Sequence, residues 1–162
     1  MKYLLALIAA VFLFSCTTQN KSNYSKIHYE AGACFGFCPM FKITINPDRT
    51  AVIDAERFTF TDGKSKDDFS GTKEGVFKAT IKEADYNKLV SMLDSLNLKS
   101  LENYYGDKNV TDLPTSHLNI TFADGTSKHI EDYGKHGTED LQAVYEFIEG
   151  LRKSQTWTKV SK

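Results

Sequence analysis

The chain has 162 residues, which is enough for one domain and short for two. Hydrophobic residues make up 41% of it and charged residues 25%, and the formal net charge is −1, as is typical of a globular domain. Residues 1–15 hold one Lys and no acid, so the rest of the chain carries a net charge of −2. This balance argues against a protein that binds nucleic acid or anionic lipid through basic patches.

The N-terminus has the pattern of an export signal. Lys2 precedes an apolar run over residues 4–14. A membrane-spanning helix needs about 20 apolar residues, so this shorter run favours a signal peptide. The stretch Leu13-Phe14-Ser15-Cys16 resembles the bacterial lipobox, although Phe14 is bulkier than the usual residue. We therefore expect cleavage after Ser15 and a lipid on Cys16. The alternatives are a plain secretory signal or a buried N-terminal helix, with Cys16 incidental.

These observations divide the chain into a signal peptide (1–15), a lipidated tether (16–25) and a single domain (26–160). The residues after Cys16 are mostly small and polar, which suits a flexible tether. The lipid makes the membrane the first predicted partner. No acidic residue directly follows Cys16, so we expect an outer-membrane location facing the periplasm.

Two cysteines remain after Cys16 is assigned, Cys34 and Cys38. An oxidising compartment favours their pairing, and Gly36 lies where a small ring most needs an unusual φ. We predict a structural disulfide before a strand. A redox-active pair is the alternative, although such pairs usually enclose two residues at a helix start. A zinc site would need a second ligand pair, which the sequence lacks.

Alternating apolar residues predict strands over 27–29, 41–45, 50–61 and 76–81, with a turn at 46–49 and a polar loop over 62–75. Apolar residues at helical spacing predict a helix over 83–97, with Thr80 and Glu83 at capping-box spacing. Strands over 118–122 and 127–133 flank Asp124-Gly125, which predicts a type I′ hairpin turn. A second helix follows Thr138, its predicted N-cap, and Trp157 is expected to pack back on the domain.

The predicted order is therefore ββββαββα. Strands joined by hairpins form a mostly antiparallel sheet, and we expect both helices to pack on one face of it. The predicted fold class is α+β, a two-layer sandwich with both helices on one face.

One family has a similar pattern. The segment Ala33-Cys34-Phe35-Gly36-Phe37-Cys38-Pro39, the strand after it, and Asp112-Leu113-Pro114-Thr115 together resemble domain of unknown function 6438, a family of envelope proteins. The resemblance runs from Ile27 to Trp157 and implies the domain bounds and the compartment. Arg49 stands in the first turn where the resemblance leads us to expect Gly. No activity is implied.

No catalytic constellation is recognised: the chain lacks a Gly-x-Ser-x-Gly elbow, a phosphate-binding Gly loop and a His-Glu-x-x-His motif. His129, Asp132 and His136 lie within eight residues and could share a metal, but such residues are more often solvated. We therefore expect no enzyme activity, no metal and no other cofactor.

The irregular segment 98–114 is long for a connection and carries Tyr104, Tyr105 and Asp112. These residues are the candidate binding surface; the alternative is that they brace the loop and close the core. The leading hypothesis is a non-catalytic domain that binds an envelope protein, peptide or glycan. A thiol–disulfide redox protein using Cys34 and Cys38 is the second hypothesis, and a purely structural envelope component is the third.

Overall fold

The computed structural model describes residues 22–61, 73–107 and 109–160. The predicted signal peptide, Cys16 and most of the polar loop lie outside these ranges. The described elements, in chain order, are β1 Tyr24–Ala31, β2 Phe41–Ile45, β3 Thr50–Ala55, β4 Gly75–Thr80, α2 Glu83–Ser95, the 3-10 helix η3 Leu98–Ser100, β5 Tyr104–Tyr105, β6 Thr115–Phe122, β7 Ser127–Tyr133, α3 Glu139–Ser154 and β8 Thr158–Lys159.

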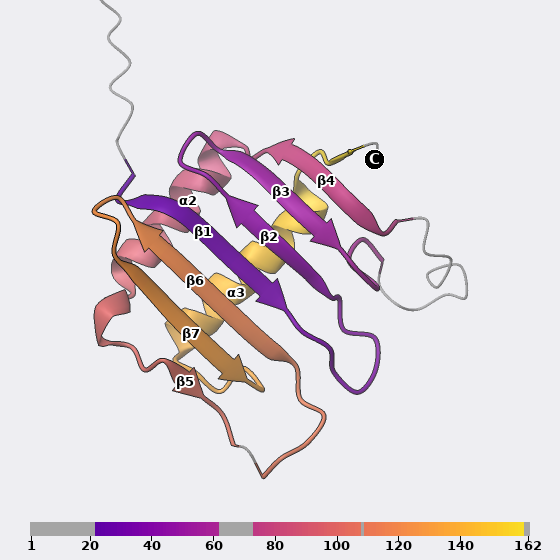
Figure 1. Cartoon of the computed structure of the whole chain (residues 1–162), viewed down its shortest axis with the longest axis vertical. Coiled ribbons are helices and arrows are strands. Elements are labelled where there is room, and N and C mark those ends of the chain that lie inside the picture. Colours follow the sequence, from indigo (N-terminus) through magenta and orange to yellow (C-terminus); the bar gives the residue numbers. More distant parts are fainter. Residues whose placement is uncertain (1–21, 62–72, 108, 161–162) are drawn as a thin grey trace, which may run out of the picture.

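The described strands form an eight-stranded sheet in the order β5-β7-β6-β1-β2-β3-β4-β8. Figure 1 labels all of them except β8. The β5–β7 pair is parallel and the other pairs are antiparallel. The α+β class and the mostly antiparallel sheet are therefore confirmed. The predicted element order is wrong because it omits β5 and β8. Each of these strands has two residues, which is too short to show any alternation.

Alternate residues of the long strands are buried, and we call the side that they share the inner face. Its members include Ile27, Tyr29, Phe41, Ile43, Ile45, Ile53, Leu118, Ile120 and Ile130. Leu89 and Leu93 of α2 and Leu141, Val144 and Ile148 of α3 join the same core. In the view of Figure 1 both helices lie behind the sheet.

The residues between those of the inner face form what we call the outer face. Pairing of neighbouring strands aligns them in two rows. One row contains Glu131, His117, Glu30, Lys42 and Asp54, and the next contains His129, Asn119, His28, Thr44 and Val52. All of these side chains are partly exposed or exposed. The chemistry-bearing residues of the sheet thus gather on the outer face.

Both predicted hairpins are present, but the β6–β7 turn differs from the prediction. A type I′ turn needs positive φ at both central residues, and here only Gly125 has it, with φ 84°. Phe122 N–H donates to the Thr126 carbonyl at 2.8 Å, which closes a three-residue loop. The β2–β3 turn is closed in the same way between Asn46 and Thr50 at 2.9 Å. Arg49 has φ 68° there, the conformation that favours Gly.

Other differences are local. The third strand ends at Ala55 rather than Thr61, because residues 57–60 form a turn in which Phe58 has φ 61°. The predicted capping box of the first helix is wrong, since Lys82 is the N-cap and makes no side-chain cap bond. The predicted cap of α3 is confirmed: the Thr138 hydroxyl accepts from the N–H of Leu141 at 3.2 Å. Among the described residues, no helix combines the length and apolar character that crossing a membrane requires.

Candidate functional site

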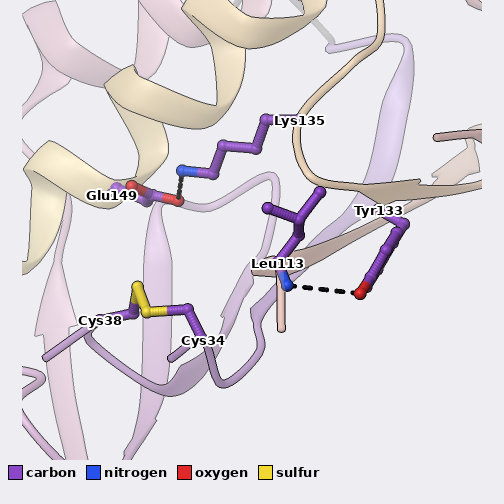
Figure 2. Close-up of a disulfide and its surroundings, with 6 residues drawn as sticks. All are labelled: Cys34, Cys38, Leu113, Tyr133, Lys135 and Glu149. Atoms are coloured by element: carbon purple, nitrogen blue, oxygen red, sulfur yellow. Dashed lines mark hydrogen bonds and ion pairs between the residues drawn. A yellow bond between two sulfur atoms is a disulfide. The ribbon is translucent and has the colours of Figure 1, made fainter. Parts of the chain in front are cut away.

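The connection between β1 and β2 contains the predicted disulfide. Cys34 and Cys38 are bonded, with their Cα atoms 5.8 Å apart (Figure 2). Gly36, at the middle of the ring, has φ 137°, which a residue with a side chain rarely adopts. Nothing lies within 4 Å of where its Cβ would be, so backbone conformation alone explains the Gly. We call residues 34–38 the disulfide loop.

The disulfide loop displays two large apolar side chains. Phe35 is 89% exposed and Phe37 is 58% exposed. The ring of Phe37 makes an edge-to-face contact with Phe58, whose centroid lies 5.6 Å away. Single exposed apolar residues are common, but two on one covalently closed loop form a preorganised apolar projection. From the sequence, this loop was predicted to be a structural disulfide, with a redox-active pair as the alternative, and the exposed aromatic residues were missed. Its two aromatic residues, enclosed by cysteines, were the signal that could have identified the projection.

Asp112, one of the predicted binding residues, lies beside the disulfide loop. Its carbonyl oxygen accepts a hydrogen bond from the N–H of Phe35 at 3.1 Å. Asp112 itself has φ 65°, so a strained backbone position supports the loop from outside. The next residue, Leu113, donates its N–H to the Tyr133 hydroxyl at 3.3 Å (Figure 2). The segment before β6 therefore braces the disulfide loop against the sheet.

Tyr104 and Tyr105 form β5 and do not share a face. Tyr104 pairs with Glu131 of the outer face, whereas Tyr105 pairs with the buried Asp132. The Tyr105 hydroxyl accepts from the N–H of Glu102 at 3.0 Å. Desolvation first, and then the neighbouring Glu131 carboxylate, raise the pKa of Tyr104. The structure thus brings Asp112 to the disulfide loop and places the two tyrosines on opposite sides of the sheet edge.

A buried polar cluster lies near this end of the domain. The Tyr29 hydroxyl donates to the Glu149 carboxylate and lies 2.9 Å from the Ser116 hydroxyl. Lys135 pairs with the same carboxylate at 2.7 Å (Figure 2). Burial first, and then the negative Glu149, raise the pKa of Tyr29 far above its ordinary range. A tyrosine held so firmly neutral serves as a hydrogen-bond donor and not as a base.

The histidines are arranged differently from the expectation. Asp132 is buried and accepts the backbone N–H groups of His136 at 2.7 Å and Gly137 at 3.0 Å. It therefore braces the turn before α3, on the opposite side of the sheet from His129. On the outer face, His129 instead lies with His117 and Glu131. Sequence reasoning missed this group because His117 and His129 are brought together by strand pairing and not by spacing along the chain.

One known family matches most of the domain. Residues 25–152 match the family model described as "Domain of unknown function (DUF6438)". The comparison with curated proteins found no match.

Proposed function

Since the chain belongs to the domain of unknown function 6438 family, whose description assigns no activity, we propose its function from the geometry. The protein is an exported bacterial lipoprotein, anchored through Cys16, whose domain binds another envelope protein without turnover. The disulfide loop is the contact. The observation that carries this proposal is the pair Phe35 and Phe37, exposed by 89% and 58% on a covalently closed loop.

Preorganisation supports the assignment. Binding costs free energy when a loop must be ordered, at about 0.5–1.5 kcal/mol for each side chain immobilised. Here the disulfide and the hydrogen bond from Phe35 to Asp112 have already ordered the backbone. Large aromatic side chains are also the residues enriched at the centres of protein interfaces. A peptide or glycan partner would use the same projection.

The position of the loop supports a partner away from the anchor. β1 runs from Tyr24 to Ala31, and the disulfide loop follows its far end (Figure 1). At roughly 3.3 Å per residue, the loop lies on the order of 25 Å from the start of the domain. A domain tethered at its N-terminus therefore carries Phe35 and Phe37 at the end of β1 that is farther from the tether. We also infer that the helices leave the outer face uncovered, which gives the two-layer sandwich. The alternation of burial along β2, β3, β6 and β7 supports this.

Site-specific photocrosslinking in the native host tests the proposal. A photoreactive phenylalanine analogue at Phe35 should give a discrete adduct with one envelope protein, and the same analogue at the exposed Glu146 of α3 is the matched control. Phe35→Ala and Phe37→Ala should each weaken binding of that purified partner by roughly 30-fold, as centrally buried aromatics do. Thermal stability of Phe35→Ala should stay nearly unchanged, because its side chain contributes little to the core. Equal labelling at Glu146, or unchanged affinity of both alanine variants, would contradict the proposal.

Thiol–disulfide exchange is the second candidate, and the partial exposure of both cysteines favours it. A redox protein passes through a mixed disulfide with its substrate. If exchange is the function, Cys34→Ser or Cys38→Ser should trap a disulfide-linked protein that a reductant releases. If binding is the function, neither variant traps such a species.

A further inference from the structure

Three side chains on the outer face offer metal ligands at one point. One ring nitrogen of His117, one of His129 and a carboxylate oxygen of Glu131 all lie within 4.8 Å of one another. The rings of His117 and His129 are stacked, with centroids 6.0 Å apart and an interplanar angle of 18°. All three side chains come from the paired strands β6 and β7, which are rigid elements of the sheet.

The strand register explains the grouping. His117 faces Glu131 directly, and Asn119 faces His129. Residues two apart on a strand share a face, so the four side chains occupy the corners of one cross-strand block. His117 and His129 are diagonal neighbours in it, within reach of each other because their side chains are long. A shift of one residue in this pairing would move all of β7's ligands to the other face.

A hydrogen bond to Asn119 orients the ring of His129. The Nδ1 atom of His129 lies 2.5 Å from the Asn119 side-chain carbonyl oxygen. That oxygen can only accept, so this hydrogen bond requires Nδ1 as its donor and leaves Nε2 as the ring nitrogen available to a metal. In metal sites a ligating histidine almost always donates its other N–H to such a partner, which sets its tautomer and orients the ring. The outer face therefore supplies both the ligands and one of their supporting groups.

Charge at the block favours a cation. Glu131 flanks His117 on one side, and Glu30 of β1 is its register partner on the other. The nearest cation to Glu30 is Lys42, at 3.7 Å in a largely exposed ion pair. His117 therefore lies between two carboxylates on neighbouring strands, which favours a bound cation. Nitrogen and oxygen donors of this kind suit a first-row divalent transition metal, whereas Ca²⁺ and Mg²⁺ prefer oxygen alone.

We propose that His117, His129 and Glu131 bind one divalent transition metal ion, with zinc as the ion of reference. Two histidines and one carboxylate leave the fourth position of a tetrahedral site for water or for a partner's ligand. Metal–ligand distances of about 2.0–2.1 Å put tetrahedral ligand atoms roughly 3.4 Å apart, so the side chains must close by little more than about 1 Å. His129 is exposed and the other two side chains are partly exposed, which leaves them room to rotate.

Titration of the full chain, purified in detergent without a polyhistidine tag, tests the site. Calorimetry with Zn²⁺ should show one saturable site per chain, and Co²⁺ should give the visible absorption of a tetrahedral complex. His117→Ala and His129→Ala should abolish saturable binding. Asn119→Ala should weaken it by roughly 10- to 100-fold, as loss of a supporting group does. His136→Ala is the matched control, because His136 is exposed but lies outside the block, and should bind as the unmodified protein does.

A second measurement needs no variant. In imidazole nitrogen NMR of the unmodified protein, Zn²⁺ should shift the ring signals of His117 and His129 and leave those of His28 and His136 in place. The proposal is overturned if no saturable site is found, if the His117 and His129 variants retain the affinity of the unmodified protein, or if His136→Ala loses it equally. Shifts spread over all four histidines would also overturn it.

Discussion

The two hairpins of the sheet, β2–β3 and β6–β7, are closed by turns of the same design. In each turn an Asp carboxylate accepts the backbone N–H of the Thr two residues later at 2.9 Å, and its hydroxyl at 2.6 Å. These hydrogen bonds from Thr hold the pKa of Asp48 and Asp124 below the usual range. The residue after each Asp has positive φ, and it is Arg49 in one turn and Gly125 in the other.

The hairpins differ in what they present on the outer face. Their inner residues are equivalent aliphatic side chains, such as Ile43 and Ile53 in one and Leu118 and Ile130 in the other. The outer residues of β2–β3 are Lys42, Thr44, Val52 and Asp54, whereas those of β6–β7 include His117, Asn119, His129 and Glu131. The turn and the buried inner residues stabilise the fold of each hairpin. The outer residues contribute little to that stability and can therefore differ. The difference between the hairpins thus lies on the face where ligands could bind.

The largest expected difference in stability between the inner and outer faces comes from substituting two adjacent residues of β6, Leu118 and Asn119. Leu118 is fully buried, so Leu118→Ala removes apolar contacts and leaves a cavity. We expect it to lower the free energy of unfolding by about 3 kcal/mol in urea denaturation. The next residue, Asn119, lies on the outer face, and Asn119→Ala should change stability by less than about 0.5 kcal/mol. Comparable losses at both positions would show that the outer face is also packed against something.

β1 lies between the two hairpins, and its Tyr29 allows a second test. The Tyr29 hydroxyl has Ser116 and Glu149 as partners, whereas the hydroxyl of the neighbouring buried Tyr145 has none among the residues that the structure describes. Tyr29→Phe removes the hydrogen-bond partner of the buried Ser116 hydroxyl and one of the partners of Glu149, and should cost about 2 kcal/mol. Tyr145→Phe removes an unpaired hydroxyl and should be neutral or stabilising. Thermal unfolding of the two variants measures the difference in stability. Equal losses of stability would show that the hydrogen bonds of Tyr29 do not stabilise the fold.

Much of the fold could be predicted because it rests on periodicity. Alternation along β2, β6 and β7 and helical spacing along α2 and α3 identify which side chains are buried, and burial is the largest contribution to folding. Thr138 was identified as a cap because capping depends on one residue type at one position. The two-residue strands β5 and β8 carry no such signal. Their pairing is set by the rest of the sheet, after it has formed.

The candidate sites were harder to predict for a similar reason. Cys34 and Cys38 are close in sequence, so their pairing could be predicted from thiol chemistry in the oxidising compartment that the sequence led us to expect. The metal-binding group requires His117 and His129, from two strands, to be aligned in one register, which the residue types alone do not determine. The exposure of Phe35 and Phe37 is likewise a property of the folded chain, because most phenylalanines are buried. Pairing and exposure emerge only when the sheet is assembled.

The smallest expected effects come from the residue with positive φ in each hairpin turn. The turn sets the strand register, and the register decides which residues lie on the inner and outer faces. A residue with a side chain pays roughly 1–2 kcal/mol in the left-handed region, partly offset by the larger unfolded-state entropy of Gly. Arg49→Gly should therefore be more stable than Arg49→Ala by about 1 kcal/mol. The alanine variant is the right reference because both substitutions remove the exposed ion pair of Arg49 with Glu83, 3.8 Å apart.

The reverse change, from Gly to Ala, can be made at Gly125 in the β6–β7 turn. Nothing lies within 4 Å of a Cβ placed on Gly125, so Gly125→Ala meets no steric obstacle and isolates the cost of positive φ. It should lower stability by about 1 kcal/mol, opposite in sign to the change from Ala to Gly at residue 49. Urea denaturation with an unchanged m value checks both, since an altered slope would mean that the unfolded or native state had changed in extent. If Gly is no better than Ala at either position, the two turns do not share a strained residue, and register must be held by the Asp–Thr bonds and the inner face instead.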